Sequence, residues 1–110
     1  MNLLRCVYKT STGVAVTGRS RLFGVISMGD YISPTTFNAE IKLYNGSSGS
    51  SPLVLQFADD QNSQYGSGYA YGSGFNSIDL PSEGILFSDG IYLEVYSDIK
   101  GISLFVCGGT

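Results

Sequence analysis

The sequence contains no histidine and no tryptophan, and it has two cysteines among its 110 residues. Histidine is the commonest general base and the commonest transition-metal ligand, so a Ser–His–Asp triad or a Cys–His pair cannot be built from this chain. Two cysteines alone cannot complete the four ligands of a structural zinc site. We therefore predict a protein that is not an enzyme and that has no catalytic residues, no cofactor and no metal ligands.

Carboxylate pairs are the remaining route to catalysis, and Asp59 and Asp60 form the one adjacent pair in the sequence. Neighbouring side chains in a strand or a turn point apart, which favours a solvated turn over a catalytic dyad. With Asn62, the two aspartates would also offer the oxygen ligands that calcium prefers, although their spacing is not that of an EF-hand. A calcium site is therefore the less favoured alternative at this position.

Charged residues are also scarce: they make up 14% of the sequence, against about 25% in an ordinary soluble domain. Such a surface is either rich in uncharged polar side chains or covered by neighbours in an assembly, since weak charge promotes self-association. The charges are uneven: residues 1–29 carry only basic ones, whereas residues 59–110 carry acids and a single Lys100. We predict that N-terminal strands pair with C-terminal strands in one fold, and complementary contact between subunits is the alternative.

Long hydrophobic runs are missing as well, and none approaches the roughly 20 residues that a membrane span requires. Residues 1–5 do not begin a signal peptide, so we expect synthesis in a cytoplasm, where Cys6 and Cys107 stay reduced. We interpret both cysteines as buried small hydrophobic residues in terminal strands. The acidic composition, with a pI of about 4.5, and the lack of a basic patch argue against nucleic acid as a partner.

The hydrophobic residues that are present alternate with a period of two, which is typical of β-strands. Ile41 and Leu43, for example, are flanked by Lys42 and Tyr44, which would face the other way. The pattern occurs at 37–44, 53–57, 91–96 and 102–106, with shorter candidates at 4–8, 14–16, 22–27 and 85–87. No window shows a helical stripe, so we expect little or no α-helix.

Glycine turns separate these strands. Asp89-Gly90 stands between two apolar runs, which predicts a hairpin, and residues 98–101 predict a second turn. Together they predict a C-terminal meander of 85–87, 91–96 and 102–107. Seven to nine short strands at spacings of about 8–12 residues predict an all-β fold: a single-domain antiparallel β-sandwich, jelly-roll-like, that spans residues 1–110.

One low-complexity segment, residues 64–75, repeats a Tyr-Gly-Ser-Gly-aromatic unit. Tyrosine offers a large contact area and a hydroxyl at low entropic cost, and glycine and serine let the backbone adapt to a partner. Tyr65, Tyr69, Tyr71 and Phe75 are therefore our candidate interface residues, for a protein partner or for stacking on a sugar or a base. The favoured alternative is that these rings are half-buried residues of strands and loops.

Four segments together resemble small virion proteins of tailed bacteriophages. They are Gly-Val-Ala-Val-Thr-Gly at 13–18, Arg-Leu-Phe-Gly-Val-Ile-Ser at 21–27, Ala-Glu-Ile-Lys-Leu-Tyr-Asn-Gly at 39–46 and Leu-Pro-Ser-Glu-Gly-Ile-Leu-Phe-Ser-Asp-Gly-Ile-Tyr-Leu at 80–93. The resemblance covers most of the chain as a pattern of short apolar strands and turns. Residues 64–75 depart from it.

The resemblance implies a β-sandwich that decorates or cements a capsid, or a related tail or fibre component. Such a protein is made in the bacterial cytoplasm and resides in the virion, and its partners are the major capsid protein, other virion proteins and copies of itself. We expect a homo-oligomeric head decoration protein. A carbohydrate-binding receptor-recognition module is the alternative, and a glycan is the less favoured partner.

Overall fold

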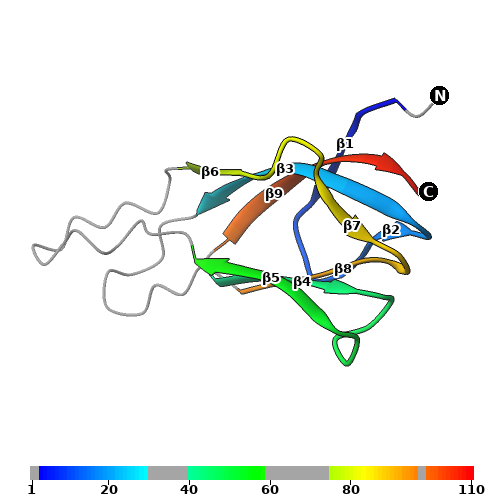
Figure 1. Cartoon of the computed structure of the whole chain (residues 1–110). Helices are drawn as coiled ribbons and strands as arrows, with labels where there is room; N and C mark the ends of the chain where they lie inside the picture. Colours follow the sequence, from blue (N-terminus) through cyan, green and yellow to red (C-terminus); the bar gives the residue numbers. More distant parts are fainter. Residues whose placement is uncertain (1–2, 30–39, 59–74, 97–98) are drawn as a thin grey trace, which may run out of the picture.

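The computed structural model describes residues 3–29, 40–58, 75–96 and 99–110, which form strands and no helix (Figure 1). In chain order the strands are β1 (Arg5–Lys9), β2 (Gly13–Thr17), β3 (Ser20–Gly29), β4 (Glu40–Asn45), β5 (Leu53–Ala58), β6 (Phe75–Asp79), β7 (Ile85–Phe87), β8 (Gly90–Val95) and β9 (Ile99–Gly108). Within these ranges no helix is long and apolar enough to cross a membrane.

The strands form two antiparallel sheets, which lie as two layers in Figure 1. Sheet A has five strands in the order β1-β9-β3-β6, with β7 also paired to β3. Sheet B has four strands in the order β2-β8-β4-β5. β6 and β7 share one edge of β3, because β6 pairs with its residues 24–28 and β7 with its residues 20–22. The predicted all-β, antiparallel class is confirmed.

A single apolar layer lies between the sheets, because alternate side chains of both sheets point toward it. The buried side chains are Leu22, Val25, Phe87, Ile99, Ile102, Leu104 and Val106 from sheet A, and Val16, Ile41, Leu43, Ile91 and Leu93 from sheet B. The arrangement is sandwich-like. Strands such as β4, β8 and β9 therefore have one face in the core and one face on an outer surface of the molecule.

The predicted alternation is confirmed in β8 and β9, and in β5 it holds for Leu55 and Phe57, which pack against the core, but not for Leu53. The pairing of β4 with β5 shifts register between Leu43 and Tyr44, which marks a bulge or a similar irregularity. Leu53 and Val54 are consequently both exposed, although Leu53 was expected on the same face as Leu55. Residues 37–39 of the predicted strand lie outside the described residues.

The predicted C-terminal meander is wrong. β7 pairs with β3 in sheet A, β8 pairs with β2 and β4 in sheet B, and β9 returns to sheet A. The Asp89-Gly90 turn thus connects a strand of sheet A to a strand of sheet B. Of these two turn residues, Gly90 has a positive φ, of 107°, and Asp89 does not. A type I′ hairpin would require a positive φ at both residues. Alternation specifies which face of a strand is buried but not which sheet the strand joins.

The side chain of Asn45 holds this corner together. The backbone N–H of Asp89 donates to Asn45 Oδ1 over 2.8 Å, and Asn45 Nδ2 donates to Ser88 Oγ over 3.1 Å. The backbone N–H of Gly46 adds a bond of 3.1 Å to the carbonyl oxygen of Gly90. The end of β4 therefore fixes the path by which the chain enters β8.

The predicted pairing of N-terminal with C-terminal strands is confirmed by β1–β9 and β2–β8. Two N-terminal arginines reach the C-terminal half through carbonyl oxygens. Arg5 Nη1 donates to the carbonyl oxygen of Gly108 over 2.8 Å, and Arg21 Nη1 donates to that of Glu83 over 3.2 Å. Hydrogen bonding to the backbone is therefore part of what joins the two halves.

We predict that Gly90→Ala lowers the free energy of unfolding by at least about 2 kcal/mol, because alanine is strained at a positive φ. The added Cβ would also lie 2.7 Å from the carbonyl oxygen of Val16. Gly24→Ala is the control, since a Cβ at Gly24 would lie an ordinary 3.5 Å from Phe105 Cδ2. Chemical denaturation measures both variants, and equal losses would contradict the prediction.

Ser27 is fully buried, and its hydroxyl has no hydrogen-bond partner among the residues that the structure describes. Ser27→Ala should raise the free energy of unfolding by about 1 kcal/mol, because an unpaired buried hydroxyl costs desolvation energy. Leu104→Ala provides the contrast and should lower it by about 2–5 kcal/mol through a cavity. A stability loss in Ser27→Ala, measured by urea unfolding, would argue against this account of Ser27.

Candidate functional site

The candidate interface residues of the sequence analysis fall mostly outside the described structure. Tyr65, Tyr69 and Tyr71 lie outside it, and so do Asp59, Asp60 and Asn62 of the calcium alternative. Phe75 is the first residue of β6, where its backbone is paired with that of Met28. The predicted interface at 64–75 therefore stays a prediction, and the candidate surfaces described here are the two outer faces of the sheets.

The first surface is the outer face of β1, β9, β3 and β7 in sheet A, which we call the apolar face. Tyr8 is 62% exposed and Met28 is 43% exposed, and Ile26 and Leu86 are also exposed there. Strand register brings them together, since Tyr8 and Ile26 both pair with Ser103 of β9. Large apolar side chains gathered in this way on an outer surface commonly mark a contact with a partner.

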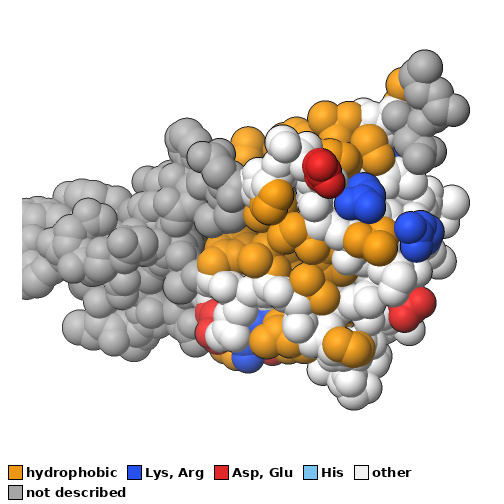
Figure 2. Space-filling view, viewed as in Figure 1, with side chains coloured by type: hydrophobic (Ala, Val, Ile, Leu, Met, Phe, Trp, Pro, Cys, Tyr) orange, Lys and Arg blue, Asp and Glu red, His pale blue; other side chains and the backbone are white. Residues whose placement is uncertain are grey.

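Charge lies at the margins of the apolar face. Arg21 lies opposite Cys107, near one end of β9, and Lys100 lies near the other end. The side chains of Arg21 and Lys100 are exposed. The ring of Tyr8 lies over the backbone of Gly101, where an added Cβ would be 2.8 Å from Tyr8 Cζ. Figure 2 shows further apolar side chains gathered between β5 and the β6–β7 edge. This second group lies at the edge between the two sheets and is not part of the outer face of sheet A.

Both cysteines lie in the strands of the apolar face, and their predicted burial is wrong for Cys6. Cys6 is exposed, Cys107 is partly exposed, and both thiols are free. Cys6 pairs with Phe105, which places Cys107 diagonally across from it. Diagonal partners have Cα atoms about 7–8 Å apart, beyond the usual disulfide span. The terminal strands therefore bring the cysteines near each other without geometry suited to a disulfide.

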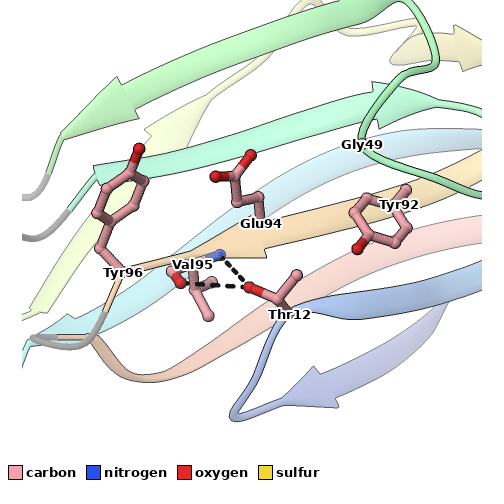
Figure 3. Close-up of a pocket in the computed structure, with 6 residues that line it drawn as sticks. All are labelled: Thr12, Gly49, Tyr92, Glu94, Val95 and Tyr96. Atoms are coloured by element: carbon pink, nitrogen blue, oxygen red, sulfur yellow. Dashed lines mark hydrogen bonds between the residues drawn. The ribbon is translucent and has the colours of Figure 1, made fainter.

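The second surface is an open groove on the outer face of sheet B, which we call the tyrosine–glutamate groove. Tyr92 and Glu94 of β8 and Tyr96, the next residue in the alternation, project from the same side of the strand (Figure 3). Thr12, Gly49 and Val95 complete the lining, and the groove has a volume of about 360 Å³. Residues i, i+2 and i+4 of a strand share a face, so the extended backbone sets this row.

Hydrogen bonds and ring packing hold the side chains of the tyrosine–glutamate groove. Tyr44 Oη donates to Glu94 Oε1 over 2.6 Å, and the rings of Tyr44 and Tyr92 meet edge to face with centroids 6.0 Å apart. At the rim, Thr12 Oγ1 accepts from Val95 N over 3.0 Å and donates to the carbonyl oxygen of Val95 over 3.3 Å (Figure 3). The carboxylate of Glu94 is therefore oriented before any partner arrives.

These contacts also set the ionisation of the groove. The hydrogen bond to Glu94, with smaller effects of burial and of the carboxylate charge, raises the pKa of Tyr44 above its ordinary value. The native state therefore holds this proton more tightly than the unfolded state. Its contribution to stability is present below the pH at which an unfolded tyrosine ionises, and it is lost as the pH rises through the folded-state pKa.

Lys42 lies beside this row, with Nζ 5.9 Å from the centroid of the Tyr96 ring, within cation–π range. The charge that Tyr96 carries when ionised is the largest cause that raises the pKa of Lys42, and desolvation opposes it. Glu40 and Glu94 raise it further. Lys42 is protonated at neutral pH, since the ordinary pKa of a lysine already lies well above 7, and its positive charge lies beside the carboxylates of Glu40 and Glu94.

The alternation in the sequence placed Tyr92, Glu94 and Tyr96 away from the core without identifying them as a site. One feature of the sequence could have indicated this site. The outward positions of β8 are aromatic and acidic, whereas a strand face exposed to solvent ordinarily carries charges of both signs. Within the described parts of the chain, no group of three or more His, Cys, Asp or Glu side chains could hold a metal ion. The tyrosine rings and the carboxylate that line the groove are suited to ring stacking and hydrogen bonding.

We find no match to this chain among protein-family models, among curated proteins or among solved structures.

We predict that Glu94→Gln lowers the pKa of Tyr44, because the charged acceptor that holds the phenolic proton is lost. An ultraviolet pH titration of tyrosinate measures the shift, and Tyr44→Phe identifies which part of the curve belongs to Tyr44. Glu40→Gln is the matched control, because Glu40 accepts from Gln56 Nε2 instead. An unchanged titration in Glu94→Gln would contradict the prediction.

Proposed function

We propose that this chain is a structural protein of a bacteriophage particle: a head decoration protein that binds the capsid shell through its apolar face. The observation that carries the proposal is the group of exposed large apolar side chains on the apolar face, from β1, β3 and β7 around the central strand β9. The segmental resemblance to small phage virion proteins agrees with it. The protein would be made in the host cytoplasm, reside in the virion and act by binding, without catalysis.

The order of the strands supports a jelly-roll form of the sandwich. The first four strands, β1 to β4, alternate between sheet A and sheet B. The last two strands insert between them: β9 lies between β1 and β3, and β8 lies between β2 and β4. With β7 set aside, two interleaved Greek keys account for this order. Jelly rolls are common in viral capsid proteins and lectins, so the order favours a structural or binding role by analogy of fold alone.

The size of the apolar face favours binding in many copies. β3 and β9 have ten residues each, so they are roughly 33 Å long, and a face three to four strands across is on the order of 15 Å wide. The resulting few hundred Å² are less than the roughly 800 Å² that each partner contributes to a standard interface. A single copy would bind a shell weakly, whereas a homo-oligomer that engages neighbouring shell subunits would gain avidity.

The experiment is a sedimentation assay with shells of the encoding phage that were assembled without this protein. Wild-type protein should co-sediment with the shells and raise their resistance to heat. Ile26→Glu and Met28→Glu should each weaken binding at least roughly tenfold, because a charge must be desolvated in an apolar contact. Cryo-electron microscopy of native particles locates the bound copies.

Leu53→Glu is the matched control, because Leu53 is exposed on sheet B and should tolerate the charge. Full binding by Ile26→Glu and Met28→Glu would overturn the role of the apolar face. Localisation in the tail or fibre would overturn the head assignment and support the related tail or fibre role. Light scattering of the isolated protein reports whether the same substitutions break a homo-oligomer, which would assign the apolar face to contacts between copies.

A further inference from the structure

A second binding surface lies on the opposite side of the molecule from the apolar face. The tyrosine–glutamate groove is formed on the outer face of sheet B, and the core layer separates it from sheet A. Its chemistry differs from that of the apolar face, because a carboxylate stands between two aromatic rings (Figure 3). A surface with this composition suits a partner that is itself both polar and apolar.

The groove is elongated along β8. Tyr92 and Tyr96 are four residues apart, which corresponds to roughly 13 Å at the rise of an extended strand, and Glu94 lies midway. The volume of about 360 Å³ is at the lower end of the range of small-molecule sites. An extended, narrow ligand would therefore contact both rings and the carboxylate at once.

The lining is organised in advance, which lowers the entropic cost of binding. Glu94 Oε1 already accepts from Tyr44, and Tyr44 packs edge to face on Tyr92. The cation of Lys42 lies near the ring of Tyr96. A carboxylate can accept several hydrogen bonds, so Glu94 keeps acceptor capacity for the hydroxyls of a ligand.

From this geometry we infer that the tyrosine–glutamate groove binds a short neutral oligosaccharide. A sugar ring presents a C–H face that packs on an aromatic ring and a rim of hydroxyls that donate to a carboxylate. Tyr92 and Tyr96 would each take one sugar unit, and Glu94 would accept hydroxyl protons between them. This inference does not rest on the proposed place of the protein in a capsid.

Electrostatics disfavour the other extended ligands. Nucleic acid and phosphorylated or sulfated glycans are anionic, and Glu94 and Glu40 stand along the same face with Lys42 as the facing cation. The chain as a whole has a net charge of −3. A neutral saccharide avoids this repulsion and can use the carboxylate as an acceptor.

The test is a glycan array screened with the wild-type protein, followed by calorimetric titration with maltotriose, cellotriose and chitotriose. We expect at least one neutral oligosaccharide to bind with a Kd of roughly millimolar or tighter. Tyr92→Ala and Tyr96→Ala should each weaken that binding at least roughly tenfold. Tyr92→Phe keeps the ring and should retain most of the affinity, and Glu94→Gln should lose much of it.

Tyr8→Ala is the matched control, since Tyr8 is an exposed tyrosine on the opposite face and should leave binding unchanged. Urea unfolding of each variant verifies that it is folded. The inference would be overturned if no neutral glycan binds, if binding requires Tyr8 as much as Tyr92, or if only anionic glycans bind. Ile26→Glu should bind the same oligosaccharide as the wild type, so failure of the capsid proposal and failure of this inference are distinguishable.

Discussion

The apolar layer between the two sheets is the constraint on which the rest of the molecule depends. Leu104 and Val25 of sheet A and Leu43 and Leu93 of sheet B are fully or almost fully buried in it. In extended strands, burial of one residue commits the next to the opposite side. The core therefore determines which side chains form the two outer faces, and those faces are where binding can occur.

The two outer faces have become chemically different while sharing one scaffold. The apolar face has exposed Tyr8, Ile26 and Met28 with charge at its margins, whereas the groove on sheet B combines tyrosines with Glu94 and Lys42. The low charge content of the sequence is thus reflected in the composition of the two faces. One face is suited to a contact that excludes water, and the other to a ligand that remains hydrated in part.

Much of the local structure could be predicted from the sequence, because period-two alternation is a local property. It placed Ile91, Leu93 and Ile102 in the core correctly, and β1–β9 pairing agrees with the separation of charge along the chain. It could not reveal that Asp89-Gly90 joins two sheets, since both layers of a sandwich bury the same kind of side chain. The groove was missed for a similar reason: its members converge through strand pairing, which no single segment of sequence displays.

The position of β9 at the centre of sheet A has a kinetic consequence. β1 is made before the other described strands, and it pairs with β9, the last of them to be made. β3 also pairs with β9 along one edge. Sheet A therefore cannot be completed until the ribosome has finished these residues, and such long-range pairing is slow. During that interval the open edge of β3 is a template for other nascent chains, so correct assembly competes with aggregation at high levels of synthesis.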